Sequence, residues 1–492
     1  MNRSPSPSHL PRNVGIIGAG PAGLTAAYQL AKAGIAVEVF EADGSVGGLA
    51  RSMDLWGQRV DLGPHRFFSQ DSRVNRLWLE VAQGRYRMVD RLTRIYYRRR
   101  FFDYPLKPAN ALINMGFGNA AACLASYFKQ QLSSPPKSDE SPSFEDWVVE
   151  RFGRKLFEMF FQSYSEKLWG IPCQELDADF AAQRIKKFTL GEAIKKALGL
   201  GGKHHKTLVD RFAYPLGGTG MIYENMARET ERRGGKIHLK CPVAGVVMEA
   251  RKAVGLKLTD GSVRPFDHVI SSMPLTLLVR SLGQAPPPVL DAVARLRFRN
   301  TILVFLEVAD QQLFPDQWLY IHSPELQFGR VTNFRNWTPE LTGRSECTIL
   351  CLEYWCYEQD AIWSESPDQQ IERAKAEIRA TGLVPERSAI RQGFVLRLPR
   401  CYPVYARGYK TLLKPVIEFL RQVEGLTAIG RYGSFKYNNQ DHSILMGILA
   451  AENLLGQGSH DLWAVNTDYE SYQESSHIEA TGLVSDTSNR EA

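Results

Sequence analysis

The run from Val14 to Glu41 constrains the fold of this 492-residue chain more than any other feature. A short apolar run ends in Gly18-Ala19-Gly20-Pro21-Ala22-Gly23, and a helical pattern closed by Gly34 leads into a second apolar run. Gly18 permits a tight turn, Gly20 lets the backbone approach a pyrophosphate, and Gly23 lets helix and strand pack closely. Glu41 ends the second run, where a carboxylate can hold ribose hydroxyls. The sequence therefore predicts a strand–turn–helix–strand unit that binds a dinucleotide.

Composition narrows the function further. No stretch of about eighteen residues is apolar and free of charge, so a transmembrane helix is not expected. The net charge of +7 is mild for this length and forms no concentrated stripe, which argues against nucleic acid and suits a small anionic substrate. The seven cysteines contain no CxxC pair, so reduced thiols are expected. These features are typical of a cytoplasmic globular protein with two or three domains.

The dinucleotide is expected to be FAD. Ser45–Arg51 holds a second glycine pair and a basic residue, and it resembles the extended fingerprint of the glutathione-reductase-like FAD proteins, which simple NAD dehydrogenases lack. Thr427–Arg431 resembles the returning segment that lies against the flavin in that family, and Asp267–Pro274 is similar to a strand of amine oxidases and protoporphyrinogen oxidases. The implied FAD-binding residues are Gly18, Gly20, Gly23, Glu41, Gly48, Arg51, Val243, Gly430, Arg431, Asn439, Gln440 and Ser443.

The predicted fold class is α/β, a glutathione-reductase-like FAD-binding Rossmann fold with a helical insertion and a β-rich substrate domain. The polar, proline-rich run 133–143 is expected to be a surface linker. The expected parts are a disordered tail at 1–12, an FAD-binding domain in three pieces at 13–100, 206–285 and 426–473, a helical insertion at 101–205, a β-rich substrate domain at 286–425 and a disordered tail at 474–492.

A second resemblance concerns the substrate. Gly430–Ser443 (GRYGSFKYNNQDHS) closely resembles the C-terminal motif of UDP-galactopyranose mutases, especially the longer eukaryotic-type enzymes. Other stretches match in the same order, and together they span most of the chain from Val14 to Leu455: 63–69, 102–106, 144–184, 212–220, the surroundings of Arg330, and 401–405.

The resemblance implies roles for individual residues. In that family two arginines bind the diphosphate of a nucleotide sugar, and the matching residues are Arg184 and Arg330. Tyr402 and Tyr437 match the tyrosines that close over the substrate. His65 matches the histidine on the loop beside the flavin. The implied catalytic residues are His65, Arg184 and Arg330, and the implied substrate-binding residues are Tyr104, Trp169, Arg184, Arg330, Tyr402, Tyr437 and Asn439.

The family reaction interconverts pyranose and furanose forms of a nucleotide sugar, without net oxidation, and reduced FAD supplies N5 as the nucleophile. No metal is needed. The source of electrons for the flavin stays open on the sequence, with NADPH and NADH as the candidates. A role in cell-wall or polysaccharide biosynthesis follows from the resemblance. Arginine suits a diphosphate because its guanidinium stays charged and binds phosphate with two parallel hydrogen bonds.

Two other functions stay open on the sequence. An FAD-dependent oxidase or desaturase of the amine oxidase and protoporphyrinogen oxidase type would share the fold, and a noncatalytic flavoprotein is a third alternative. Pro64, Lys107, Ser165 and Trp337 depart from the mutase pattern and leave the nucleotide and sugar open. Oligomeric state is not determined. His204-His205 is expected to lie in a basic loop without a metal, and Arg98–Arg100 to be a solvated strand edge.

Overall fold

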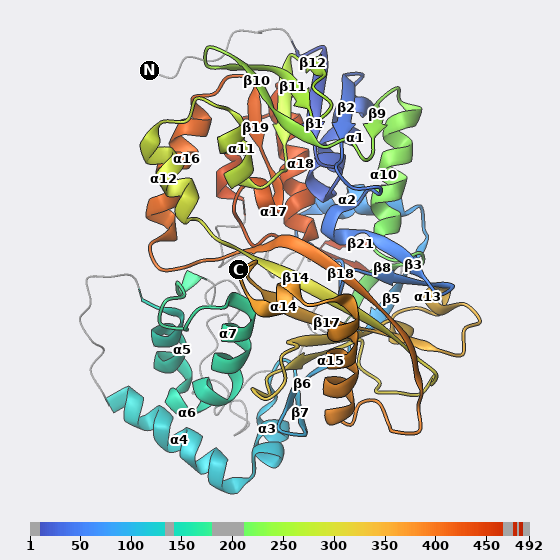
Figure 1. The fold of residues 1–492 in the computed structure, drawn as a ribbon, viewed down its shortest axis with the longest axis vertical. Helices are drawn as coiled ribbons and strands as arrows, with labels where there is room; N and C mark the ends of the chain where they lie inside the picture. The colour runs from blue at the N-terminus through green and yellow to red at the C-terminus, as the bar shows by residue number, and fades with distance from the viewer. Residues whose placement is uncertain (1–9, 133–141, 180–210, 466–475, 480–481, 486–492) are drawn as a thin grey trace.

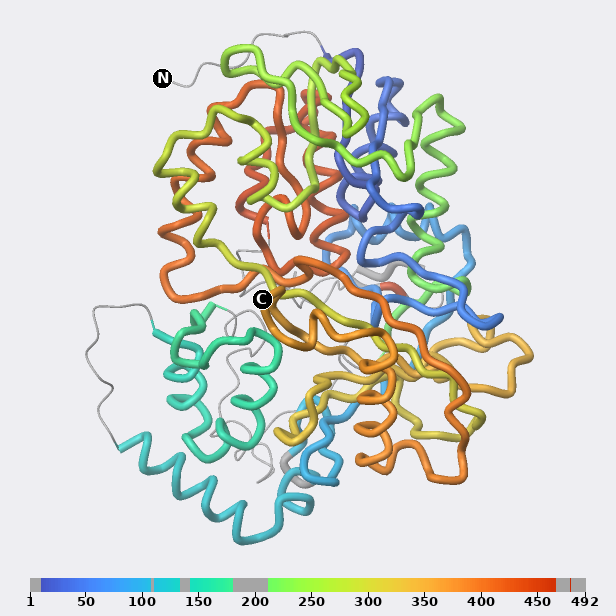
Figure 2. The backbone as a smooth tube through the Cα atoms, viewed as in Figure 1, coloured from blue at the N-terminus to red at the C-terminus, as the bar shows by residue number. Residues whose placement is uncertain are grey.

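A computed structural model describes residues 10–132, 142–179, 211–465, 476–479 and 482–485 (Figure 1). Arg184 and the His204-His205 pair therefore lie outside the described residues, as do most of the N-terminal tail and of the linker. Figure 2 shows N-terminal segments, in blue, and C-terminal segments, in red, side by side in the upper half of the molecule.

A five-stranded parallel sheet forms the centre of that half. Its order is β19 (Leu426–Ala428), β13 (His268–Ser271), β1 (Asn13–Ile17), β2 (Ala36–Phe40) and β9 (Lys236–His238). These strands come from both ends and the middle of the sequence, as a nucleotide-binding domain interrupted by insertions requires. The predicted fold class is confirmed.

Four helices pack together in one layer beside this sheet: α1 (Pro21–Lys32), α2 (Ser72–Ala82), α10 (Gly220–Arg232) and α18 (Gln440–Leu454). The contact between α1 and α18 is unusually close, because a Cβ added at Gly447 would lie 2.6 Å from the Ala22 carbonyl oxygen. The C-terminal helix is thereby fixed against the helix that follows the glycine turn. The upper half also holds the sheet of β10 (Val243–Glu249), β11 (Lys252–Leu258) and β12 (Val263–Pro265), with α11 (Leu275–Ser281), α12 (Pro287–Arg295) and α16 (Tyr409–Arg421) (Figure 1).

A seven-stranded sheet forms most of the lower half. Its order is β18 (Ile390–Pro403), β14 (Phe298–Val308), β17 (Thr348–Cys356), β16 (Arg330–Asn333), β15 (Trp318–Ile321), β6 (Thr93–Tyr97) and β7 (Arg100–Asp103). Helix α15 (Pro367–Ala380) contacts β14 and β18. Because β6 pairs in parallel with β15, this sheet begins at residue 93 in sequence, ahead of the expected domain boundary at residue 100.

The helical insertion consists of α3 (Pro108–Met115), α4 (Phe117–Leu132), α5 (Phe144–Phe152), α6 (Arg154–Phe157), the π-helical turn η2 (Glu158–Gln162) and α7 (Ser163–Trp169). Ser143 begins α5 through a capping box, since its hydroxyl accepts a hydrogen bond of 3.1 Å from the Asp146 amide. None of the helices in the described part of the chain combines the length and the apolar character that a membrane-spanning segment requires.

Shorter elements connect these layers. They are β3 (Ser52–Leu55) paired with β4 (Gln58–Asp61), β5 (Tyr86–Asp90) paired with β8 (Arg211–Pro215), α13 (Pro339–Thr342), α14 (Ala361–Ser364), α17 (Gly430–Gly433) and the 3₁₀ turns η1 (Gly48–Ala50), η3 (Phe334–Asn336) and η4 (Leu462–Ala464).

The C-terminal tail differs from the prediction. Residues expected to be disordered form a hairpin of β20 (Ser476–Glu479) and β21 (Gly482–Ser485), which contacts α2 and β8. Ile478 is buried in the same core cluster as Leu77 of α2. The tail is polar on average, but one apolar side chain and the strand pairing anchor it, so the expectation of disorder is wrong for these described residues.

Candidate functional site

The glycine turn has the geometry that the sequence predicts. Gly18 adopts a φ of 95°, and its amide donates a 2.8 Å hydrogen bond to the Phe40 carbonyl. A Cβ at Gly23 would lie 2.0 Å from the Gly18 carbonyl oxygen, so the helix can approach the turn only with glycine there. The Glu41 carboxylate accepts hydrogen bonds of 2.8 Å and 2.9 Å from the amides of Ala19 and Asp43. The acid is thus fixed beside the turn.

The second glycine pair lies on the first. The Gly47 amide donates a 2.8 Å hydrogen bond to the Ala19 carbonyl, and a Cβ added at Gly48 would lie 3.1 Å from the Gly20 Cα. Arg51 forms a 2.9 Å ion pair with Asp43. Val243 is the first residue of β10. Two residues earlier, the Cys241 amide donates a 2.8 Å hydrogen bond to the Glu41 carbonyl, which brings this segment close to Glu41. Residues far apart in sequence therefore surround one backbone cradle.

The returning C-terminal segment closes on the start of α1. Gly430 has a φ of 81°, and a Cβ there would lie 2.9 Å from the Ala22 Cβ. Asn439 is exposed at the N-terminus of α18, while the Ser443 hydroxyl donates to the Asn439 carbonyl at 3.2 Å. The Gln440 amide is bound by protein on both sides, to the Arg66 carbonyl and the Tyr223 hydroxyl. We therefore expect a ligand to meet Gln440 through its backbone.

Arg431 lies within a cluster of aromatic rings. Its guanidinium carbon is 4.2 Å from the Tyr437 ring centroid and 4.8 Å from that of Tyr402. Nε and Nη1 each donate a 2.8 Å hydrogen bond, to the carbonyls of Cys401 and Asn438. Trp169 is buried beside both tyrosines, with ring centroids 6.2 Å from Tyr402 and 5.8 Å from Tyr437. The structure thus brings the predicted Trp169, Tyr402 and Tyr437 together around a cation.

Arg330 forms a bidentate ion pair with Glu353. Nε and Nη2 approach the two carboxylate oxygens at 2.5 Å each, and the two residues are cross-strand partners on β16 and β17. Burial alone would lower the pKa of the Arg330 guanidinium, but the Glu353 carboxylate and the Tyr402 hydroxyl raise it well above its usual value. Glu353 uses two of the five guanidinium N–H groups, and the others can serve an anion.

His65 lies on a loop next to this ion pair. A Cβ at Gly63, which has a φ of 108°, would lie 3.1 Å from a Glu353 carboxylate oxygen, and the Thr219 hydroxyl donates to the His65 carbonyl at 2.8 Å. Burial, with the positive charges of Arg330 and Arg431, lowers the pKa of His65 to about 3. Near neutral pH the ring is therefore an uncharged imidazole.

Comparisons with known proteins identify the family to which the chain belongs. The model of the family "Flavin containing amine oxidoreductase" matches residues 21–349, which is more than half of the chain. The chain belongs to this family. As an amine oxidoreductase family member, it shares a fold with a reduced UDP-galactopyranose mutase, at a TM-score of 0.81 and 22% identity, covering 93% of this chain and 98% of the other. It also shares it with a putative protoporphyrinogen oxidase from Exiguobacterium, at a TM-score of 0.69 and 18% identity, covering 91% and 99%.

Curated relatives are matched over shorter stretches. A probable UDP-galactopyranose mutase from Klebsiella pneumoniae is 30% identical over 36% of this chain and 46% of its own length. The protoporphyrinogen oxidase 2 of Arabidopsis thaliana is 42% identical over 13% of each chain. The chain thus spans less than half the length of either relative.

The cradle fits the dinucleotide part of the family's flavin. A Cβ added at Gly20 would meet nothing nearer than the Gly48 Cα at 3.9 Å, so space remains over the Gly20 backbone. The start of α1 adds free N–H groups and the positive end of the helix dipole. The residues that would hold the cofactor remain those predicted from the sequence, with Gly20 and Gly48 facing the pyrophosphate.

Tyr104 lies at the outer end of the aromatic cluster. Its side chain is 40% exposed, and its ring centroid is 5.0 Å from that of Tyr320. Tyr320 is 5.6 Å from Tyr164, which in turn is 5.6 Å from Trp355. Trp355 is 6.3 Å from Tyr402, so Tyr104 and Tyr402 lie at opposite ends of a row of aromatic rings, and a ligand that contacts both must be long.

Sequence reasoning missed several residues of the site, and Glu353 is the most important. It is the one charged residue in β17, a strand buried along its whole length, and an acid in such an apolar run is itself a signal for a buried partner. Tyr405 was also missed. Its hydroxyl accepts a 2.7 Å hydrogen bond from the Tyr437 amide, and its ring stacks on Trp169.

The departures from the mutase pattern have separate structural roles. Trp337 is buried in an aromatic core, 4.8 Å from Tyr214, and its indole donates to the Gln317 carbonyl at 3.3 Å. Ser165 is buried on α7. The Lys107 ammonium is exposed and lies 3.4 Å from Asp103. Pro64 follows Gly63 on the His65 loop, where its ring fixes φ.

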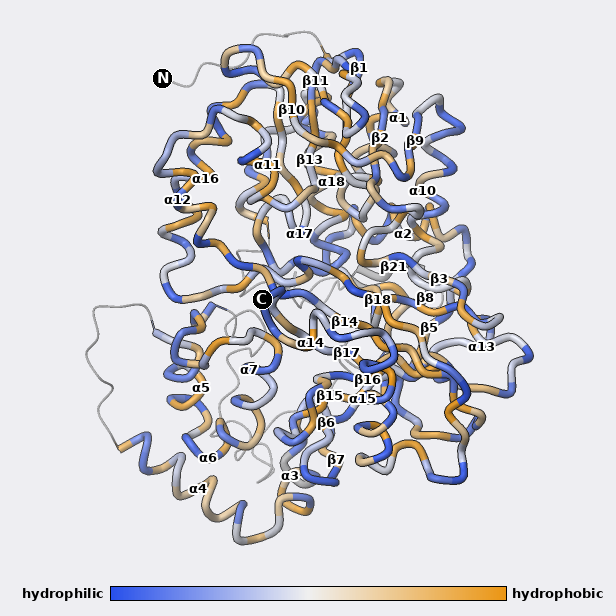
Figure 3. Tube along the Cα trace, viewed as in Figure 1, coloured by the Kyte–Doolittle hydropathy of each residue, from blue (hydrophilic) through white to orange (hydrophobic). Residues whose placement is uncertain are grey.

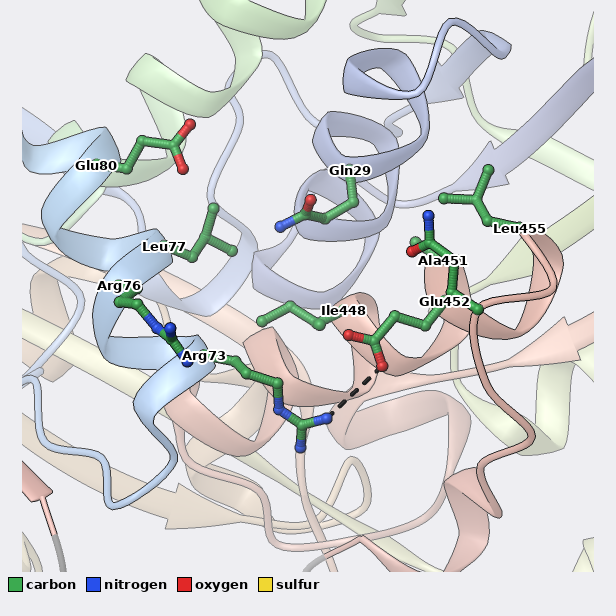
Figure 4. Close-up of a pocket in the computed structure, with 10 residues that line it drawn as sticks. Gln29, Arg73, Arg76, Leu77, Glu80, Ile448, Ala451, Glu452 and Leu455 are labelled. Atoms are coloured by element: carbon green, nitrogen blue, oxygen red, sulfur yellow. Dashed lines mark ion pairs between the residues drawn. The ribbon is translucent and has the colours of Figure 1, made fainter.

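Two cavities lie away from these residues. A cleft of about 240 Å³ opens between α1, α2 and α18, with the Arg73–Glu452 ion pair of 3.6 Å at its rim (Figure 4). A cavity of about 890 Å³ lies between β6, α4 and α7, and its lining includes Arg98 and Lys167. Among the described residues, none of those predicted for the site lines either cavity.

His322 provides a test of burial near the aromatic cluster. Its ring stacks on Tyr164 at 4.8 Å, and burial together with the charge of Lys167 lowers its pKa to about 3. Below about pH 6.5 the unfolded chain binds a proton at this ring and the folded chain does not. The unfolding free energy therefore decreases as the pH is lowered, by up to about 1.4 kcal/mol per pH unit. We expect His322→Phe to flatten the pH dependence of the unfolding free energy between about pH 6 and pH 4 by that slope, measured by urea unfolding. An unchanged slope would mean that the folded protein protonates this ring.

Proposed function

We propose that the protein is an FAD-dependent nucleotide-sugar mutase of the UDP-galactopyranose/UDP-galactofuranose type. The observation that carries the proposal is the convergence of Arg330, Arg431, Tyr402 and Tyr437, from three separate segments, beside His65. Two half-buried guanidiniums flanked by phenol hydroxyls suit a doubly charged diphosphate. The resemblance of 430–443 to the mutase motif and the name of the Klebsiella relative support the same reading.

The reaction requires the diphosphate to leave the sugar and to be kept nearby until it returns. When bound in the cradle, the reduced flavin supplies the nucleophile for this chemistry. We assign the retention of the diphosphate to Arg330 and to Arg184. The phenols of Tyr402 and Tyr437 donate hydrogen bonds to it, and the aromatic walls exclude water, which strengthens every charge interaction inside. Because its pKa is lowered, His65 is uncharged and adds no positive charge that would draw the diphosphate away from the arginines.

Finer assignments belong to the same proposal. NADPH or NADH would act as the reductant, the location would be cytoplasmic, and the product would serve cell-wall or polysaccharide biosynthesis. Asn439, Trp169 and Tyr104 would contact the substrate. We also propose the domain division predicted from the sequence, except that β6, predicted to lie in the FAD-binding domain, joins the β-rich domain through its pairing with β15.

A second candidate function is an oxidase or desaturase. The family match itself favours it, as does a relative such as the zeta-carotene desaturase of Capsicum annuum, 27% identical over 35% of this chain and 34% of its own length. An apolar polyene or a neutral amine has no anionic group for Arg330 and Arg184, and this favours the mutase.

The two functions differ in what they do to the flavin. We expect protein reduced with dithionite under anaerobic conditions to convert UDP-galactofuranose to UDP-galactopyranose, as followed by chromatography, and the oxidised protein to be inactive. A control without substrate should leave the reduced flavin spectrum unchanged. Flavin reduction by an added amine or polyene, with peroxide formed in air, would contradict the mutase and support the oxidase. If the protein is inactive with uridine nucleotides but isomerises another nucleotide sugar, the proposed substrate is wrong in its base or its sugar, and the proposed reaction class stands.

A further inference from the structure

The lower edge of the molecule carries an exposed apolar face, which we call the α3–α4 face. It consists of five side chains: Leu112 (48% exposed), Ile113 (78%), Phe117 (92%), Phe128 (56%) and Leu132 (89%). Helix α4 projects from the rest of the molecule in Figure 1, and Figure 3 shows apolar stretches on α3 and at both ends of α4. Such a concentration of large exposed apolar side chains marks an interaction surface.

The helical spacing places these residues on one side. Phe117, Phe128 and Leu132 are separated by eleven and four residues, and Ala121 and Ala125 fill the turns between them, so these five residues of α4 lie along one stripe of that helix. Leu112 and Ile113 belong to α3. The core-facing side is different: Ala120 and Cys123 are buried, and a Cβ added at Gly153 would lie 2.8 Å from the Tyr127 amide. The stripe therefore faces away from the side on which α4 packs.

Cations border this face. Arg98 and Arg99 form the β6–β7 turn and Arg100 begins β7; all three are exposed, and the Arg100 guanidinium donates a hydrogen bond to the Asn114 carbonyl of α3. This contact fixes the arginine turn beside Ile113. Lys129 of α4 is also exposed, whereas the Lys107 ammonium lies 3.4 Å from Asp103. An apolar face bordered by exposed arginines has the composition of a helix that lies on an anionic membrane surface.

We infer that the α3–α4 face docks the protein on the surface of an anionic lipid bilayer. The apolar side chains enter the boundary between headgroups and acyl chains, and Arg98–Arg100 lie over the negatively charged headgroups. The helices rest in the plane of the surface and do not span it. A second protein copy would meet like charge at this rim, which disfavours pairing of two such faces.

The test uses the full chain and vesicles. We expect the protein to sediment with vesicles of phosphatidylcholine and phosphatidylglycerol and to bind pure phosphatidylcholine about 100-fold more weakly, since each of the three arginines near the surface contributes about a factor of five. Added salt should weaken the binding. The variant Phe117→Glu with Leu132→Glu should lose binding at least about tenfold. Arg98→Gln with Arg99→Gln should reduce the preference for the anionic vesicles.

A matched control distinguishes binding through this surface from nonspecific binding to the vesicles. Leu290 on α12 is 40% exposed, and Leu290→Glu should leave vesicle binding unchanged. The glutamate variants sit at exposed positions, and their thermal unfolding should match that of the wild type. Equal binding to neutral and anionic vesicles, or unchanged binding by the double glutamate variant, would overturn the inference. So would a lipid-free dimer, detected by light scattering, that the same glutamates dissociate, because a second copy would then cover the face.

Discussion

Replacing Arg330 with methionine is expected to abolish turnover and to lower the unfolding free energy by about 3–5 kcal/mol. The stability loss arises because the Glu353 carboxyl group, 2% exposed in its side chain, is left in a buried site without its guanidinium partner. The loss of turnover arises because the remaining guanidinium N–H groups no longer hold the diphosphate. Urea unfolding and the anaerobic isomerisation assay measure the two effects separately, and the visible spectrum checks that flavin is still bound.

A compensating variant separates the two roles of Arg330. Arg330→Met combined with Glu353→Leu removes both charges, so stability should return to within about 1–2 kcal/mol of the wild type while turnover stays lost. Arg330→Lys should keep the charge but fail to restore the bidentate geometry, and thus recover little activity. Recovered turnover in the Met/Leu variant would show that Arg330 is purely structural. Loss of flavin in the single variant would place Arg330 at the cofactor instead.

Gly20→Ala is expected to leave the protein folded but to reduce flavin content more than about tenfold. The added Cβ has room within the protein, since its nearest neighbour would be the Gly48 Cα at 3.9 Å, and the backbone at Gly20 (φ −79°) accepts alanine. The same Cβ occupies the space through which a pyrophosphate approaches the backbone. Flavin absorbance per protein, with thermal unfolding of the flavin-free forms, measures the effect.

Gly23→Ala serves as the contrasting variant. Its Cβ would lie 2.0 Å from the Gly18 carbonyl oxygen, so the turn itself must shift and both folding and flavin binding should suffer. Gly118→Ala is a neutral control, because nothing lies within 4 Å of the added atom and the residue is distant in sequence from the cradle. Full flavin content in Gly20→Ala would contradict the placement of the pyrophosphate.

The nucleotide-binding unit could be predicted because its signals are local. The glycine spacing, the helix closed by Gly34 and the acid at Glu41 each act within a few residues, and the structure confirms the strand–turn–helix–strand order. The α/β fold class followed from the same signals, repeated at the two ends of the chain. The resemblance of motifs in the same order also selected Trp169, Tyr402 and Tyr437 together, and the structure brings these three into contact.

Pairings between distant strands could not be predicted. The parallel pairing of β6 with β15 joins residues more than two hundred positions apart, and periodicity carries no information about which strand becomes the neighbour. The hairpin of β20 and β21 was missed because its anchor, Ile478, is one apolar residue in a polar tail. The exposure of the apolar stripe of α4 could not be predicted either. Its spacing is that of a helix face packed on a core, and only the structure shows that this face is exposed.

The sequence by itself determined the fold class, the glycine cradle and the kinds of side chain that a diphosphate needs, because these depend on residue type and short-range spacing. Only the tertiary structure decided what surrounds those side chains. The register of β16 on β17 places Arg330 opposite Glu353 and joins their charges, and burial among the neighbouring cations keeps His65 neutral. Both effects depend on distances and solvent exclusion between segments far apart in the chain, which the order of residues does not specify.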